Sequence, residues 1–484
     1  MSLKSNAFYN ILLNVSNVLF PFITTPYVSK VLGVENIGIV NFAITYASYF
    51  VMVAMLGVPT YGMRVIASYQ ISGNDNRQAV FIELSTIIFI FSLIVSSIYV
   101  ISIFAIPQLY EQKDFLLVAG LTVYLASLNI EWYFGGRERF KLITVRSLVV
   151  KVAMTAGMFI FVRTRQDIMP YLLLMVGATL LNHVWNWIYL LRYDWKKVEW
   201  NTLRFKYHIK PLLMLFSATL AINIYTMLDT IMLGFLSDYN QVGYYTSAMK
   251  ISRIVMPLAT AMSPVVFARV SALKESGETE QIKQILHNSF SYMYTLAVPL
   301  TIGLVVLSPR FVPMFFGPEF MPAILPMQLL SLLVIIIGIS NVYGTQMVQA
   351  MGHDKQFLMA VITGTIINFT LNMLLIKPYG AIGASIASIA AEIVVLVIMA
   401  IFAHQIINLN IGFKNLARPV VASLPILAFS VILNNYFSIN HITYFSILIT
   451  SSGLSYFGLM LFVFKDQTVI NMFNSVIKKC TMKS

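Results

Sequence analysis

Two cations and one carboxylate stand in stretches of this chain that are otherwise almost wholly apolar. Lys250 and Arg253 are three residues apart, a spacing that places both side chains on one face of a helix. With a rise of about 1.5 Å per residue from Gly243, they lie roughly 10 and 15 Å along that helix, and Asp229 reaches a similar depth in the preceding stretch. Because an arginine can hold a phosphate through two parallel hydrogen bonds, the group predicts a cationic site for a phosphorylated ligand. The alternative is a structural ion pair hidden between helices.

Three further charged residues widen the candidate set. Lys151 falls within an apolar stretch. It is either a further ligand for the phosphorylated group or a cation whose side chain extends to the membrane interface. Lys30 ends the first apolar stretch, either at the mouth of a cavity or as a simple helix-end cation. Glu392 lies near the middle of another stretch, and a buried carboxyl group there is often protonated. Asp229 and Glu392 are therefore candidates for coupling to H⁺ or Na⁺, and no other cofactor is expected. The alternative for Glu392 is a neutral, packed glutamic acid.

The stretches that carry these residues are long enough to cross a membrane. The chain is 58% apolar and only 11% charged, whereas a soluble domain carries about a quarter charged residues. We count about fourteen apolar stretches of roughly twenty residues each. The sequence therefore predicts an all-α polytopic membrane protein.

The cations between the stretches predict its orientation. Most of the 32 Lys and Arg residues fall in alternate gaps, which places those gaps and both termini on the cytoplasmic side of the cell membrane. The net charge of +13 reflects this orientation and not nucleic-acid binding. The gap from Arg192 to Lys210 is basic and aromatic, which predicts a linker that lies on anionic lipid or that gathers an anionic lipid-linked substrate.

An internal repeat organises the stretches. The pairs that match when the chain is shifted by 205 residues include Gly38 with Gly243, Pro59 with Pro264, and Arg64 with Arg269. The shift spans six helices, so both copies have the same topology. We expect two pseudo-symmetric six-helix bundles followed by two C-terminal helices, with boundaries at residues 1–205, 206–410 and 411–484. Two such bundles would enclose a central cavity and work by alternating access.

Motifs for several enzyme classes are absent from the sequence. It contains no phosphate-binding G-x-x-x-x-G-K-[ST] loop and no HExxH zinc motif. Its single cysteine, Cys480, excludes a disulfide framework. We therefore expect a transporter and not an enzyme.

Several segments resemble bacterial polysaccharide flippases of the Wzx type, within the superfamily that also holds MATE transporters and lipid II flippases. They are residues 10–27, LGVENIGIVNFA at 32–43, GVPTYGMRVIA at 57–67 and EWYFGGRERF at 131–140. The resemblance implies a MATE-like fold. It also implies movement of undecaprenyl-diphosphate-linked oligosaccharide repeat units from the cytoplasmic to the outer leaflet, for capsule, O-antigen or other surface polysaccharide.

The resemblance also implies roles and partners. Lys30, Lys250, Arg253 and Lys151 would meet the diphosphate and sugars of the substrate. The partners would be this lipid-linked oligosaccharide, membrane lipids and the polymerase and other polysaccharide-assembly proteins. The alternatives are an H⁺- or Na⁺-coupled drug antiporter, for which an acidic cavity is expected, and a flippase for teichoic acid or lipid II, which shares the same physics.

Overall fold

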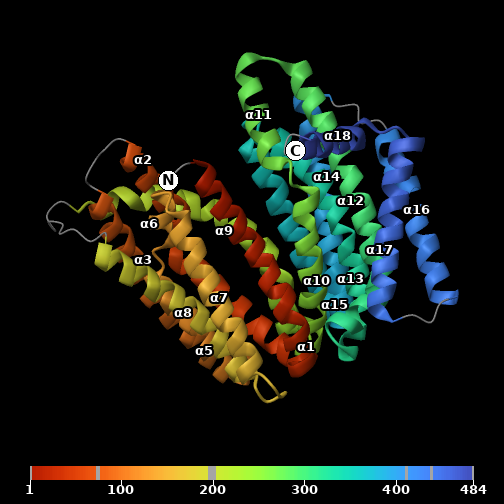
Figure 1. Ribbon diagram of the computed structural model, residues 1–484. Helices are drawn as coiled ribbons and strands as arrows, with labels where there is room; N and C mark the ends of the chain where they lie inside the picture. The colour runs from red at the N-terminus through yellow and green to blue at the C-terminus, as the bar shows by residue number, and fades with distance from the viewer. Residues whose placement is uncertain (1–2, 72–76, 194–202, 409–412, 437–439, 482–484) are drawn as a thin grey trace. The chain divides into compact units, whose positions relative to one another are not determined.

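Helices joined by short turns make up the protein (Figure 1). The computed structural model describes residues 3–71, 77–193, 203–408, 413–436 and 440–481, and no strand occurs within these ranges. The chain divides into two compact units, unit 1 (Met1–Gly243) and unit 2 (Tyr244–Ser484). The predicted all-α architecture is confirmed.

Unit 1 holds the first nine α-helices and the start of the tenth. Their bounds are α1 Leu3–Met55, α2 Val58–Ile71, α3 Arg77–Ala105, α4 Pro107–Tyr110, α5 Lys113–Leu125, α6 Glu131–Gly136, α7 Phe140–Phe161, α8 Ile168–Tyr193 and α9 Phe205–Leu236, with a short 3₁₀ turn, η1, at Ala126–Leu128. Its core lies where α2, α3, α6 and α8 pack together around the buried side chains of Trp132 and Phe134.

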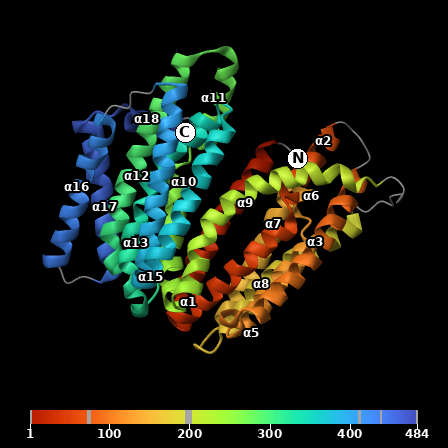
Figure 2. The same ribbon diagram turned by 180° about the vertical axis from the view of Figure 1, so that it is seen from behind.

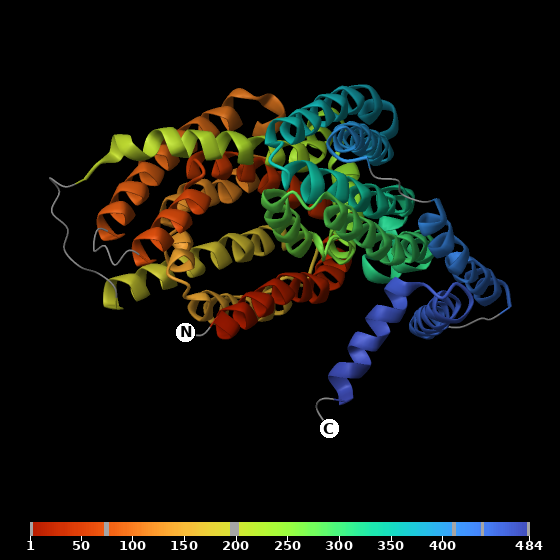
Figure 3. The same ribbon diagram turned by 90° about the horizontal axis from the view of Figure 1, so that it is seen from above.

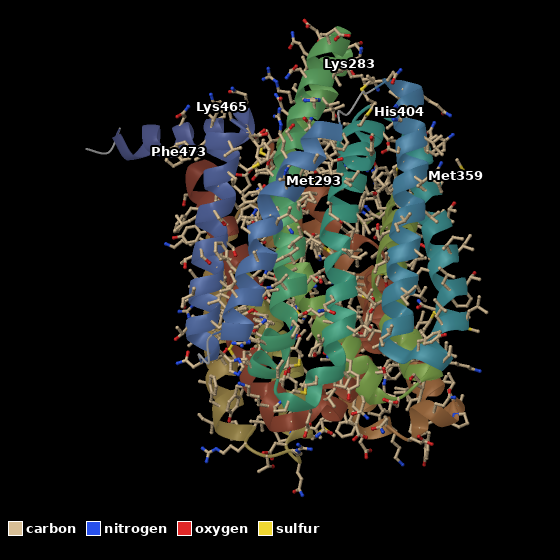
Figure 4. The ribbon with its side chains drawn as sticks, turned by 90° about the vertical axis from the view of Figure 1, so that its right-hand side faces the viewer. Lys283, Met293, Met359, His404, Lys465 and Phe473 are labelled. Carbon is tan, nitrogen blue, oxygen red and sulfur yellow. The ribbon has the colours of Figure 1, made fainter. Side chains whose placement is uncertain are left out.

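Unit 2 begins within α10, Tyr239–Ala259. The remaining elements are α11 Ser263–Ser276, α12 Thr279–Phe315, η3 Pro318–Ala323, α13 Ile324–Ser331, α14 Leu333–Tyr343, the π-helical η4 Gly344–Gln349, α15 Asp354–Ile406, α16 Phe413–Tyr436, α17 His441–Gly458, the π-helical η5 Leu459–Val463 and α18 Gln467–Thr481. α12 extends from Lys283, at one end of the unit, past the buried Met293 (Figure 4). The final helix, α18, runs across the direction of α16 and α17 (Figure 3).

Two helices are long enough to cross a membrane twice. α1 and α15 each contain 53 residues, or about 80 Å of helix, against a hydrocarbon core of about 30 Å. Each is broken at a glycine with positive φ, Gly33 (φ 79°) in α1 and Gly380 (φ 53°) in α15. Glycine adopts this conformation at little cost because it has no Cβ atom. Both breaks fall between spans that the hydropathy pattern separates.

The helix lengths fit the predicted number of spans. Among the described residues, nine helical segments are long and apolar enough to cross a membrane, or ten if the bent pair α10–α11 is one span. The breaks in α1 and α15 divide two of these segments, and α5 and α9, if they cross as well, would bring the total to fourteen. About fourteen passes therefore fit the structure.

The internal repeat is confirmed by the element boundaries. α2 runs from Val58 to Ile71, and α11 begins and ends 205 residues later. The break at Gly33 likewise has a counterpart 205 residues later, between α9 and α10. The predicted boundaries at residues 205 and 410 stay a prediction. Residues 194–202, the middle of the basic linker, lie outside the described residues.

Candidate functional site

A polar seam joins α1 to α7 within unit 1. Thr144 Oγ1 donates a hydrogen bond to the carbonyl oxygen of Tyr9 (2.9 Å), and at the other end Tyr27 Oη donates to the carbonyl oxygen of Val162 (2.8 Å). Each pair is separated by 135 residues. The constant separation means that α1 and α7 run parallel and in register along this seam.

Lys151 occupies the middle of this seam with the same 135-residue separation. Its Nζ atom donates to Ser16 Oγ (2.8 Å) and to Asn17 Oδ1 (2.6 Å), both on α1. Ser16 is buried, and its hydroxyl donates a hydrogen bond to the carbonyl oxygen of Leu13 (2.7 Å). An ammonium group has three N–H donors, and among the described residues only two of those of Lys151 have hydrogen-bond acceptors. The third donor has no acceptor within these ranges.

A second charged group lies five residues earlier on α7. Arg146 is only 2% exposed, and its Nη2 atom is 2.5 Å from Glu131 Oε2 on α6. Nη1 also donates to the carbonyl oxygen of Asn182 on α8 (3.4 Å). The burial of Arg146 was not predicted from the sequence, although its position inside an apolar helix was a signal for it. This ion pair joins three helices of unit 1.

A buried polar triad fixes the start of α9. His208 Nδ1 is 2.9 Å from Tyr61 Oη on α2, and His208 Nε2 is 2.6 Å from Glu83 Oε2 on α3. Glu83 Oε1 also accepts a hydrogen bond from the backbone N–H of Arg204. All three side chains of the triad are buried. No local sequence pattern predicts this triad, because its partners are distant along the chain.

The other predicted residues of unit 1 lie apart from this seam. Lys30 is exposed at the end of the first half of α1, three residues before the break at Gly33. Asp229 is buried on α9, with 6% of its surface exposed.

In unit 2, α10 carries the two cations and α15 carries the carboxylate. Lys250 is half-buried and Arg253 is exposed. Glu392 is half-buried, one helical turn after Ser388, whose hydroxyl lies 3.1 Å from Tyr245 Oη on α10. Residues four apart share a helix face, so Glu392 lies on the face of α15 that meets α10. The predicted meeting of Asp229 with Lys250 joins residues of different units and stays a prediction.

The part of the chain that the structure describes holds no cluster of three or more His, Cys, Asp or Glu side chains able to bind a metal ion.

The sequence signature of a known family covers more than half of this chain. The family is described as polysaccharide biosynthesis protein, and the match extends over residues 3–274. The chain belongs to this family. As its spans already indicated, it is a multi-pass membrane protein, and the resemblance to Wzx-type flippases is confirmed.

Relatives from a bacterium and an archaeon match this member of the family over most of its length. The "Putative O-antigen transporter" of Escherichia coli (strain K12) is 24% identical over 84% of this chain and 97% of its own length. The "Probable low-salt glycan biosynthesis flippase" of Haloferax volcanii is 21% identical over 88% of both chains.

Solved structures show the same fold. An inward closed conformation of the lipid II flippase MurJ has a TM-score of 0.74 over 95% of this chain and 99% of its own, at 18% identity. An inward-facing multidrug resistance MATE family transporter of the MOP superfamily has a TM-score of 0.61 over 80% of this chain and 93% of its own, at 12% identity. The predicted MATE-like fold is therefore confirmed.

Proposed function

We propose that this protein is a flippase that carries an undecaprenyl-diphosphate-linked oligosaccharide repeat unit from the cytoplasmic to the outer leaflet of the cell membrane. The observation that carries the proposal is the family match over residues 3–274. The names of its relatives, an O-antigen transporter and a glycan biosynthesis flippase, support it. In this proposal both termini are cytoplasmic, the chain catalyses no reaction, and polymerase and other assembly proteins are its partners.

The cations within the helices supply the physical basis. Moving a diphosphate through a medium of low dielectric constant is costly unless positive groups travel beside it. Lys151, with one N–H donor left by Ser16 and Asn17, is such a group in unit 1. Lys250 and Arg253 are such groups in unit 2, where Arg253 can hold a phosphate through two parallel hydrogen bonds.

The remaining predicted residues would act at other steps of transport. Lys30, exposed at the break in α1, would release the head group at the outer side. Asp229 and Glu392 would bind and release H⁺ or Na⁺ as the cavity alternates between the two sides. The lipid tail stays in the bilayer while the sugar-diphosphate head crosses.

The test is translocation of lipid-linked oligosaccharide in proteoliposomes. Wild type is compared with Arg253→Ala and Lys250→Ala, and Lys283→Ala is the matched control because Lys283 pairs with Glu280 (2.7 Å) on an exposed surface of α12. Removal of one charged hydrogen-bond donor is expected to cost roughly 1.5–3 kcal/mol, or about ten- to a hundredfold in rate.

Two outcomes would overturn either the role of these cations or the flippase itself. If both variants match wild type, the flippase remains but these cations are structural. If wild type moves no lipid and instead exports small cations, the protein is an antiporter.

A further inference from the structure

A basic pocket opens on unit 1 where α6 meets α7. It has a volume of about 590 Å³ and is lined by Arg137, Arg139, Lys141, Leu142, Val145 and Tyr189. Glu138 is its one acidic residue, so the pocket carries two net positive charges. It lies at the N-terminal end of α7, where the helix dipole also favours an anion. Arg137, Glu138 and Arg139 belong to the EWYFGGRERF segment, which contains none of the cations of the proposed function.

The guanidinium groups of the pocket are held in place by tyrosines. Arg139 Nη1 donates to Tyr189 Oη (2.8 Å), and the Arg139 guanidinium lies 5.7 Å from the centre of the Tyr189 ring. The Arg137 guanidinium lies 5.5 Å from the centre of the Tyr133 ring. Guanidinium groups that are positioned in advance lose less conformational entropy when they bind an anion.

The side chain of Glu138 is tied to α1 by a hydrogen bond. Its Oε2 atom accepts a hydrogen bond from Asn6 Nδ2 (3.3 Å) on α1. The segment is fixed further by close packing of α6 on α2, since a Cβ atom at Gly136 would lie 2.7 Å from the carbonyl oxygen of Met63. The pocket is therefore a built feature of unit 1.

An apolar groove continues from this pocket along α7 and α8, which lie side by side (Figure 2). The groove has a volume of about 370 Å³, and its lining consists of Val149, Val150, Ala153, Leu181, Val184, Trp185 and Ile188. On α7, Val149 and Ala153 follow Val145 of the pocket at successive turns, and on α8, Trp185 and Leu181 precede Tyr189 in the same way. The groove thus begins where the basic pocket ends.

A charged pocket that leads into one apolar groove matches the two parts of a lipid-linked diphosphate. We propose that this site, which rests on the proposed function, captures the substrate lipid from the cytoplasmic leaflet before its head enters the transport cavity. Arg137, Arg139 and Lys141 hold the diphosphate, and the groove between α7 and α8 holds the first part of the polyprenyl chain. Three cations match the charge of a diphosphate better than they match the single negative charge of a common phospholipid. One groove fits the single hydrocarbon chain of a polyprenyl lipid better than the two chains of a phospholipid.

The test measures binding without transport. Native mass spectrometry of the full chain in detergent, with undecaprenyl diphosphate as the probe, compares wild type with the double variant Arg137→Ala/Arg139→Ala. Val149→Trp fills the groove without touching the charges. The matched controls in unit 2 are Lys283→Ala for the cations and Val397→Trp for the groove, since Val149 and Val397 are 47% and 50% exposed.

The two site variants are expected to bind undecaprenyl diphosphate at least about tenfold more weakly, while the two controls bind as wild type does. In proteoliposomes, the site variants should raise the KM for the lipid-linked oligosaccharide and leave kcat unchanged. Unchanged binding in both site variants would overturn the inference. So would equal affinity for phosphatidylglycerol, or complete displacement of the lipid by inorganic pyrophosphate at micromolar concentration.

The two proposals fail separately. A wild-type protein that binds undecaprenyl diphosphate through this site but translocates no oligosaccharide would overturn the proposed function and leave the binding site in place. A wild-type protein that translocates, and whose site variants bind and transport normally, would overturn only the capture site.

Discussion

Gly38 and Gly243, which are equivalent positions of the 205-residue repeat, pack backbone to backbone in unit 1. A Cβ atom at Gly38 would lie 1.7 Å from the carbonyl oxygen of Tyr239 and 3.1 Å from the nitrogen of Gly243. A Cβ atom at Gly243 would lie 2.4 Å from the carbonyl oxygen of Val34. Small residues allow membrane helices to approach this closely, so the same position in both copies of the repeat serves one contact.

Replacing either glycine should therefore destabilise the protein. Gly38→Ala places a methyl group against backbone atoms that cannot rotate away, and overpacking of this kind costs about 1–3 kcal/mol or more. The thermal midpoint of unfolding in detergent is the measurement. Gly177→Ala on α8 is the matched control, because a Cβ atom there would meet no heavy atom within 4 Å. An equal midpoint for the two variants would contradict the close contact.

The buried triad predicts a second difference in stability. Glu83→Ala removes the acceptor for the buried side chain of His208 and for the backbone N–H of Arg204. Leaving a buried hydrogen-bonding group without its partner costs about 1–3 kcal/mol, and more if that group is charged. The control is Glu280→Ala, which breaks the exposed pair with Lys283 and should cost at most about 1 kcal/mol. Chemical unfolding should separate the two variants, and comparable losses would show that the triad adds little.

The sequence predicted the helices better than the contacts between them. The break at Gly33 and the repeat of α2 in α11 follow from hydropathy and matched residues, because both are local or periodic signals. The seam between Lys151 and Ser16 depends on residues 135 positions apart, and so no local pattern predicts it. Hydropathy gives the depth of a residue in the membrane but not the neighbour that it faces. The pairing of Arg146 with Glu131 could not be predicted for the same reason.

The turn between α7 and α8 predicts a dependence of stability on pH. Asp167 Oδ2 accepts hydrogen bonds from the backbone N–H groups of Arg163 (2.9 Å) and Thr164 (2.7 Å) and from the Thr164 hydroxyl (2.9 Å). The bond from Arg163, followed by those from Thr164, lowers the pKa of Asp167. Because the folded state has the lower pKa, this carboxylate stabilises the fold above its unfolded pKa of about 3.9. That stabilisation is lost as the pH falls through the folded pKa.

The measurement compares wild type with Asp167→Asn from pH 7 to pH 3. Wild type should unfold at the higher temperature at pH 7, and the difference should shrink as the pH falls below about 4. Asp354→Asn, at the start of α15, is a control for the loss of an acidic residue near a helix start. A difference that stays constant over the whole range would show that the ionised form of Asp167 is not what stabilises the turn.

The seam between α1 and α7 separates a transport role for Lys151 from a purely structural one. If Lys151 only holds α1 to α7, then Lys151→Ala and the double variant Ser16→Ala/Asn17→Ala should lower stability and transport alike, since both break the same bonds. If the third N–H of Lys151 meets the diphosphate, Lys151→Ala should slow translocation by about tenfold or more, because it removes a charged donor. Ser16→Ala/Asn17→Ala should slow it much less at equal loss of stability, because the ammonium remains. Translocation rates at matched amounts of folded protein decide between them, and equal rates for the two variants would make Lys151 a structural residue.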